Sequence, residues 1–231
     1  MKPFLDFRLA LNVLFPNACV VCKNPFVFDH QNLICQDCLS QMKEDILFYC
    51  HSCGKSGDNT YPVCNECIPE RKYEDIKVFT SYYKVQHAIR HLKFQKIKTL
   101  AKDLGLLIKD DIQDYIKSNK IQNVLYVPIS EKVQKERGFN HLKEILRYCV
   151  PSFLVKDYIK KVRETDLQVR LNKEERFKNL KDAFSLTVDK LEGNTLVFDD
   201  VITTGATLLE IFRVLKGKVN GKVYAYAIAK G

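Results

Sequence analysis

The chain has 231 residues, 46% of them hydrophobic, and its 37 Lys and Arg against 28 Asp and Glu give a formal net charge of +9. This length suits one medium domain with a small appendage, and the hydrophobic content is sufficient for a core. No apolar run reaches the roughly 18 residues that span a bilayer, which excludes a membrane-spanning helix and makes a folded, soluble protein our expectation.

The opening stretch, residues 1–16, carries Asp6 and Arg8 inside an apolar pattern. A signal peptide keeps its apolar centre free of such charges. We therefore predict an amphipathic helix over 1–16.

Cysteines mark the next stretch. Eight of the nine cysteines form CxxC pairs, and the spacing of these pairs lets two sets of four thiolates each surround a tetrahedral Zn²⁺. The eight predicted metal ligands are Cys19, Cys22, Cys35, Cys38, Cys50, Cys53, Cys64 and Cys67. Disulfides would need a secreted chain, and iron–sulfur ligation fits the repeated spacing less well. Two structural zinc ions in a reducing, cytoplasmic compartment are therefore predicted, and the ninth cysteine, Cys149, is interpreted as a core residue.

The grouping of these cysteines sets the domain organisation. We expect the first four to share one ion and the last four the other, with cross-braced pairing as the alternative. Residues 17–70 contain few aliphatic residues in series, so metal would replace a core there. The sequence thus predicts a zinc-binding module at 17–70 and a second domain at 71–231.

Strand and helix patterns alternate from residue 76 onward. Residues 76–83 predict a strand, 84–102 form a basic run without an acid, and the leucines from Leu100 onward predict a helix. Further strands are predicted at 123–130, 152–155, 195–200 and 222–229, and helices at 137–149 and 205–217. This order implies an α/β fold with a largely parallel sheet flanked by helices, whose ligands bind at the carboxyl ends of the strands.

Two acids, Asp199 and Asp200, end the strand at 195–200, and the turn at 203–207, TTGAT, opens the following helix. Backbone N–H groups at a helix start and threonine hydroxyls can bind a phosphate, whereas carboxylates accept hydrogen bonds from vicinal hydroxyls. A ribose 5-phosphate fits both groups, because its phosphate would bind the turn and its hydroxyls would bind the two acids. The plainer alternative is a capped helix whose dipole favours nearby acids. Two adjacent acids followed by a TTGAT turn are more specific than a helix cap requires, so we favour the ribose 5-phosphate.

These residues resemble the motif of type I phosphoribosyltransferases that binds PRPP, 5-phosphoribosyl 1-pyrophosphate. Together with four CxxC pairs, VPIS, ERGFNH and the segment 163–184, they resemble the ComF family of competence proteins over nearly the whole chain. Ser130 replaces a common second Pro, and His141 stands where Gln is usual after RGFN. The family pattern in 163–184 is matched by Arg163, Gln168, Leu171, Arg176, Asn179 and Phe184.

The resemblance implies a type I phosphoribosyltransferase-like domain behind a small double zinc-ribbon-like module, acting in the cytoplasm in DNA uptake for natural transformation. It implies that Asp199 and Asp200 hold the ribose hydroxyls as catalytic acids and that Mg²⁺ accompanies PRPP. The 5-phosphate would lie on Thr203, Thr204, Gly205, Ala206 and Thr207, and the pyrophosphate on Val127, Pro128, Ile129 and Ser130.

Two further sets of cations are candidates for phosphate contacts. Arg137, Arg163 and Arg176 could face the pyrophosphate, with a solvated helix face as the alternative for each. The basic run at 84–102 interleaves with aromatic rings, a combination that suits single-stranded DNA, with a solvated face again as the alternative. The predicted DNA contacts are Arg90, Lys93 and Lys96, beside Tyr82, Tyr83 and Phe94.

Three functions compete on these grounds. The favoured one is a ComF-like competence protein that binds PRPP or a related nucleotide and handles incoming single-stranded DNA, with other cytoplasmic competence proteins as partners. An active phosphoribosyltransferase of nucleobase salvage is the second, but about two dozen residues after Thr207 leave little room for a base-binding element. The third, an adaptor with a vestigial PRPP site, conflicts with the intact acids and turn. The resemblance itself does not imply a transferase reaction.

Overall fold

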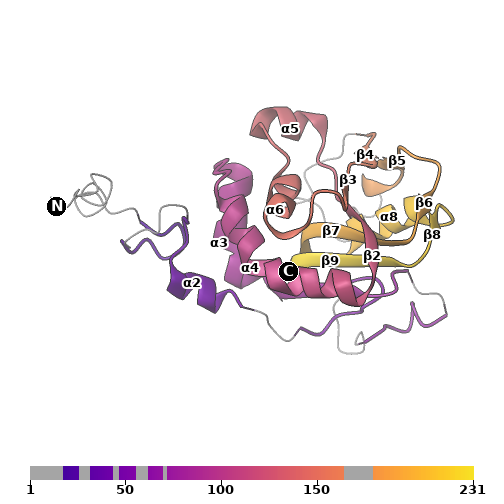
Figure 1. Ribbon diagram of the computed structural model, residues 1–231, viewed down its shortest axis with the longest axis horizontal. Coiled ribbons are helices and arrows are strands. Elements are labelled where there is room, and N and C mark those ends of the chain that lie inside the picture. Colours follow the sequence, from indigo (N-terminus) through magenta and orange to yellow (C-terminus); the bar gives the residue numbers. More distant parts are fainter. Residues whose placement is uncertain (1–17, 26–31, 44–46, 56–61, 70–71, 164–178) are drawn as a thin grey trace, which may run out of the picture.

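The computed structural model describes residues 18–25, 32–43, 47–55, 62–69, 72–163 and 179–231 (Figure 1). The amphipathic helix predicted at 1–16 lies outside these residues. The elements are α2 (Gln36–Gln41), β1 (Ile76–Ser81), α3 (Tyr82–Phe94), α4 (Leu100–Ser118), β2 (Ile121–Tyr126), α5 (Glu131–Arg137), α6 (His141–Cys149), β3 (Val155–Lys156), β4 (Ile159–Lys161), β5 (Phe184–Leu186), β6 (Leu191–Glu192), β7 (Asn194–Ile202), α8 (Ala206–Leu215), β8 (Val219–Asn220) and β9 (Val223–Lys230).

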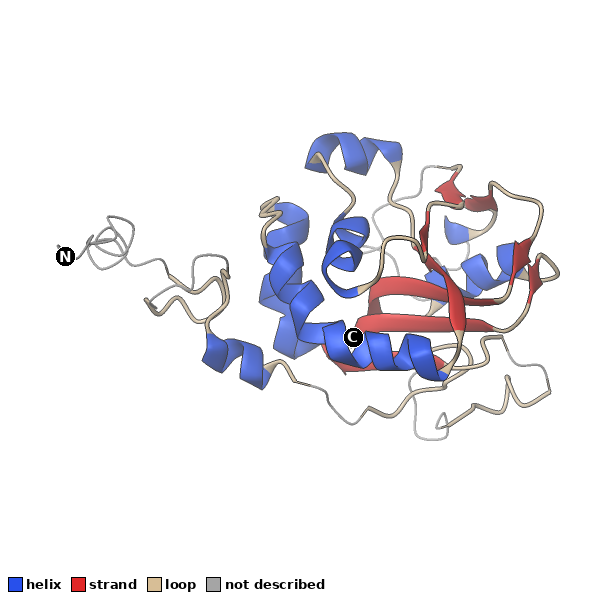
Figure 2. Cartoon of the chain, viewed as in Figure 1, coloured by secondary structure: helices blue, strands red, loops and turns tan. Residues whose placement is uncertain are grey.

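A five-stranded sheet with the order β1-β9-β7-β2-β3 forms the centre of the fold, and all its neighbouring strands pair in parallel. Helices α3, α4 and α6 cover one face of this sheet and α8 covers the other (Figure 2), as right-handed crossovers between parallel strands in this order require. Two small pairs, β4 with β5 and β6 with β8, lie apart from it. The predicted α/β class with a parallel sheet is confirmed.

The central strands are apolar because both of their faces are covered. Almost every residue of β7 and β9 is buried, as expected for the inner strands of a parallel sheet. Phe198 of β7 pairs with Tyr126 on one side and with Tyr226 on the other. On the helical side, Leu104 and Ile108 of α4 are fully buried. The core therefore lies between the sheet and an amphipathic helical layer.

The helix predicted at 137–149 is found as α6, but it begins at His141, because Arg137 ends the separate helix α5 and a turn follows it. Helix α5 ends at Arg137, and Gly138 follows with φ +85°, a left-handed conformation that suits glycine. Helix α6 then begins behind Asn140, whose side chain accepts from the backbone N–H of Leu142 at 3.0 Å and of Lys143 at 3.2 Å.

Strand β1 lies at one edge of the sheet, and a residue from the cysteine-rich segment covers it. The hydroxyl of Tyr49 donates to the carbonyl of Ile76 at 3.0 Å and accepts from the N–H of Val78 at 2.8 Å. Tyr49 is itself buried, with 5% of its surface exposed. The chain between the two cysteine clusters is thus attached to the sheet edge.

Candidate ligand site and metal centres

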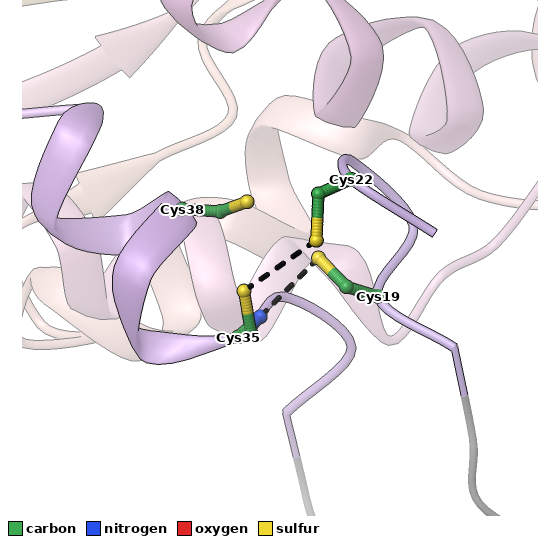
Figure 3. A group of neighbouring side chains, drawn as sticks. All are labelled: Cys19, Cys22, Cys35 and Cys38. Carbon is green, nitrogen blue, oxygen red and sulfur yellow. Dashed lines mark hydrogen bonds between the residues drawn. The ribbon is translucent and has the colours of Figure 1, made fainter. Parts of the chain in front are cut away.

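The eight predicted ligands form two separate clusters of four cysteines. In the first cluster, Cys19, Cys22, Cys35 and Cys38 point their sulfurs at one another beside α2 (Figure 3). In the second cluster the members are Cys50, Cys53, Cys64 and Cys67. Within each cluster all sulfurs lie within 4.8 Å of one another. Consecutive grouping is therefore confirmed, and the cross-braced alternative is wrong.

The geometry of both clusters fits a tetrahedral metal ion. A tetrahedron with metal–sulfur bonds of about 2.3 Å has sulfur–sulfur edges of about 3.8 Å. The sulfurs of Cys22 and Cys35 are 3.8 Å apart, and those of Cys53 and Cys64 are 3.9 Å apart. This donor set suits two structural zinc ions.

Backbone N–H groups donate hydrogen bonds to one sulfur in each cluster and so stabilise its thiolate form. The sulfur of Cys19 accepts from the N–H of Val21 and of Cys35, both at 3.4 Å. The sulfur of Cys50 accepts in the same way from Ser52 at 3.4 Å and from Cys64 at 3.3 Å. Burial raises the pKa of both thiols, but these donors outweigh it and lower the pKa of Cys19 and of Cys50 to about 7. Zinc binds the thiolate, so these contacts favour metal binding.

The second cluster packs directly against the turn that precedes α8. Gly205 in this turn has φ +77°, and a Cβ there would lie only 2.3 Å from the carbonyl oxygen of Cys53. Leu209 of α8 packs against the four cysteines, and the buried hydroxyl of Tyr73 donates to the carbonyl of Leu208 at 2.7 Å. The TTGAT turn therefore packs against the second cysteine cluster, a contact that the sequence spacing did not reveal.

The first cluster contacts a different part of the fold. The backbone N–H of Leu33, next to this cluster, donates to Asp103 Oδ2 of α4 at 2.8 Å. Asp103 is 2% exposed, and its Oδ1 has no hydrogen-bond partner among the described residues. In Figure 1 the segment of the first cluster lies at the left near α2, whereas that of the second lies at the lower right, below the sheet. The two clusters therefore support separate regions of the domain.

Asp199 and Asp200 lie near the carboxyl end of β7, and both are buried, with 9% and 3% of their surface exposed. The backbone N–H of Asp200 donates to Asp199 Oδ1 at 2.9 Å. Asp200 Oδ2 lies 2.5 Å from the ammonium of Lys93 and 3.1 Å from His141 Nε2. Asp200 is thus paired with a positive charge from α3, that of Lys93, and with a hydrogen bond from His141 of α6.

The hydrogen bonds of His141 fix its tautomer. A guanidinium can only donate, so His141 Nδ1 accepts from Arg137 Nη1 at 2.6 Å, which leaves the ring proton on Nε2, facing Asp200. Burial lowers the pKa of His141 to about 4, in agreement with a neutral ring. His141 is therefore a fixed, uncharged donor to Asp200.

The two acids differ in their protonation. Burial acts to raise the pKa of both. For Asp200 the charge of Lys93 and the contact with His141 outweigh burial, so its pKa lies well below its usual range. For Asp199 the neighbouring charge of Asp200 adds to burial and raises its pKa. The site therefore combines an ionised carboxylate with one that favours its protonated form.

A cavity of about 180 Å³ joins the acids to the turn. Thr204 Oγ1 accepts from the N–H of Ala206 at 3.4 Å, and the ammonium of Lys230 donates to the carbonyl of Thr203 at 2.7 Å. The lining residues are Lys93, Val127, Pro128, Ile129, His141, Leu142, Lys161, Phe184, Asp199, Asp200, Val201, Ile202, Thr203, Thr204, Gly205, Ala206, Thr207 and Leu208. The acids, the whole TTGAT turn and three of the four predicted pyrophosphate-loop residues thus share one cavity.

Other predicted ligands lie elsewhere. Ser130 caps α5, where its hydroxyl accepts from the N–H of Val133 at 3.3 Å. Arg137 stands behind His141, and Arg163 donates to the carbonyls of Asn179 at 2.6 Å and Lys181 at 2.8 Å. None of these three predicted ligands lines the cavity. The remaining one, Arg176, lies outside the described residues.

Three ionisable residues of the cavity were not predicted there. Lys93, which we predicted among the DNA contacts, instead reaches Asp200, and Lys161 of β4 also lines the cavity. The third, His141, was noted only as a departure from the family pattern. Its position behind the motif RGFN, at the start of a helix near the carboxyl edge of the sheet, is the signal that could have indicated it.

Comparison with known proteins supports this arrangement. A model of the double zinc ribbon domain matches residues 10–68. Competence protein F of Haemophilus influenzae is 27% identical over 243 aligned residues, which cover 100% of both chains. DNA utilization protein YhgH of Salmonella typhimurium is 26% identical, and that of Escherichia coli K12 is 25% identical, each covering 87% of this chain and 91% of its own.

In the part of the chain that the structure describes, no helix has the length and apolarity to cross a membrane. The cysteine clusters occupy the region matched by the zinc ribbon model, and the α/β domain falls within the aligned length of these relatives. The chain is therefore a homologue of competence protein F over its whole length and of DNA utilization protein YhgH over 87% of it, with an N-terminal double zinc ribbon domain.

Proposed function

We propose that this protein binds PRPP or a related phosphoribosyl ligand in the cavity at the end of β7 and handles single-stranded DNA during DNA uptake in the cytoplasm. The carrying observation is that the acid pair and the TTGAT turn line the same cavity. The names of the relatives, competence protein F and DNA utilization protein, agree with a role in DNA use.

The two ends of the cavity match the two parts of a ribose 5-phosphate. At one end, the first turn of α8 presents backbone N–H groups that lack partners within the helix, beside the hydroxyls of Thr203, Thr204 and Thr207. At the other end, the ionised Asp200 can accept hydrogen bonds from ribose hydroxyls. Asp199 and Asp200 would also hold the Mg²⁺ that accompanies PRPP, whose charge offsets that of the pyrophosphate.

A role in nucleobase salvage is less well supported. The structure describes every residue after Thr207, and these residues form α8, β8 and β9. All three elements belong to the α/β domain, so this part of the chain offers no separate element to bind an acceptor base. We therefore propose ligand binding and leave transfer to a base out of the function.

One face of α3 supports the DNA part of the proposal. Tyr83, His87, Arg90 and Phe94 are all exposed and recur at the spacing of one helix face. Tyr83 and Phe94 are both aromatic, and 66% of the surface of each is exposed. Aromatic rings beside cations on one surface suit stacking of bases and contact with phosphates.

Calorimetry tests the ligand site. Asp200→Asn removes the charged acceptor and should weaken PRPP binding by about 1–3 kcal/mol. Thr207→Ala should have a smaller effect, because neighbouring backbone donors remain. The matched control is Asp189→Asn, an exposed aspartate outside the cavity, which should bind as the wild type does. Wild-type protein with no affinity for PRPP, or Asp200→Asn with unchanged affinity, would contradict the proposal.

A further inference from the structure

Lys93 provides the positive charge nearest to the acid pair. It lies in the last turn of α3, and its ammonium is 2.5 Å from Asp200 Oδ2. Its side chain is 23% exposed, whereas that of Asp200 is 5% exposed. Among the described residues that line the cavity, Lys93 and Lys161 are the lysines, and no arginine is present.

The contacts of Asp200 leave its Oδ2 fully engaged. A carboxylate oxygen has two lone pairs, and Oδ2 already receives the ammonium of Lys93 and the N–H of His141. A ribose hydroxyl that reaches this oxygen must therefore replace one of the two donors. Oδ2 of Asp200 is thus closed to a ribose hydroxyl as long as both donors stay in place.

Lys93 is the donor that can leave. The ring of His141 is 5% exposed and is held from behind by Arg137. Lys93 has a flexible four-carbon stem and reaches the cavity with its side chain still in contact with solvent. Its ammonium can swing away from Asp200 without any movement of the helix backbone.

An anionic group at C1 of the ribose gives the released ammonium a new partner. Arg137 and Arg163, which sequence reasoning assigned to the pyrophosphate, do not line the cavity. The 5-phosphate is matched by the turn before α8 at the opposite end of the site. The cavity cation that is both partly exposed and in contact with Asp200 is Lys93.

We infer that Lys93 is an exchangeable counterion, which neutralises Asp200 in the free site and transfers its ammonium to the C1 pyrophosphate when ribose hydroxyls take its place. This inference rests on the proposed function. It makes Lys93 a specificity residue, since a ligand without a charged group at C1 displaces the ammonium into solvent and gains nothing in return.

Calorimetry with two ligands, PRPP and ribose 5-phosphate, tests the exchange. Lys93→Gln should weaken PRPP binding about ten- to a hundredfold, the range of a charge-assisted hydrogen bond, and should leave ribose 5-phosphate binding unchanged or tighter. The matched control is Lys117→Gln, which alters an exposed lysine in the last turn of α4 and should change neither affinity. A second measurement uses the wild-type chain, so that it does not depend on how the variant folds. Ribose 5-phosphate should raise the rate at which Lys93 is reductively methylated, and PRPP should lower it.

The alternatives give different results. Equal weakening of both ligands by Lys93→Gln would mean that Lys93 only holds Asp200 in place, and unchanged affinities would mean that it plays no part; either outcome overturns the exchange. A methylation rate of Lys93 that responds identically to both ligands would do the same. If wild-type protein binds neither ligand, the proposed function fails, and the inference fails with it.

Discussion

Replacing Gly205 by alanine would test the contact between the second cysteine cluster and the turn before α8. At φ +77° a residue with a Cβ is less stable than glycine by about 1–2 kcal/mol. The new Cβ would also lie 2.3 Å from the carbonyl oxygen of Cys53, so the backbone of the turn or of the cluster has to move. Overpacking of this kind costs about 1–3 kcal/mol. The expected loss in the free energy of unfolding is therefore about 2–5 kcal/mol.

Gly217 provides a matched control for the backbone conformation. Its φ is +75°, and a Cβ at this position would meet nothing within 4 Å. Gly217→Ala should therefore lower the free energy of unfolding only by the cost of the left-handed backbone conformation, about 1–2 kcal/mol. The effect of a glycine-to-alanine change on the unfolded chain is similar at both positions, so it cancels in the comparison.

Urea unfolding of the zinc-loaded protein measures the difference, provided that the slope m is the same in all variants. Gly205→Ala should be less stable than Gly217→Ala by about 1–3 kcal/mol. It should also release one of its two zinc ions to a chromogenic chelator faster than the wild type, because Cys53 is a ligand in the second cluster. Equal stability losses in the two variants, together with wild-type release of zinc, would refute the reasoning.

Three further predictions concern metal, pH and DNA. Elemental analysis should give two zinc ions per chain. Cys64→Ser should lose one ion and PRPP binding, whereas Cys35→Ser should lose one ion and keep PRPP binding. Equal effects of the two variants on PRPP binding would contradict this. Burial raises the pKa of Asp103 to about 6, so the folded protein retains a proton that the unfolded chain releases from about pH 4. Stability should therefore fall as the pH rises from about 4 to 6, and thermal unfolding of Asp103→Asn should lack this fall; the same fall in the variant would assign it to other groups. Changing Arg90 and Lys96 to Gln should flatten the slope of log K against log salt for single-stranded DNA by about 1.4 units. An unchanged slope would mean that these two residues do not contact DNA and are only solvated.

The features that the sequence predicted well depend on residues close together in the chain. The two cysteine clusters follow from CxxC spacing, because each pair needs only one tight turn to direct two sulfurs to the same point. The acids and the turn are separated by two residues, so a strand that ends beside a helix brings them into one cavity. Local geometry was sufficient for both sites.

The features that were missed depend on contacts between distant segments. The acid-free run that contains Lys93 has the composition of a solvated face, and only the position of the last turn of α3 brings that ammonium to Asp200. Arg163 lies in the family pattern, but its guanidinium donates to two backbone carbonyls instead of lining the cavity. Helix α5 has no buried residue, and therefore no apolar period from which to predict it; its ends are set by the cap at Ser130 and by Gly138.

The contact of Tyr49 with β1 has a consequence for how this chain avoids association. An edge strand with free N–H and C=O groups can add a strand from another molecule, which is a common route to aggregation. One phenol oxygen engages both the carbonyl of Ile76 and the N–H of Val78, so an incoming strand cannot pair at this point of β1. Tyr49 directly precedes Cys50, the first residue of the second cluster. Zinc bound at that cluster would thus also protect the sheet from intermolecular strand addition, and we expect a chain stripped of its metal to self-associate more readily.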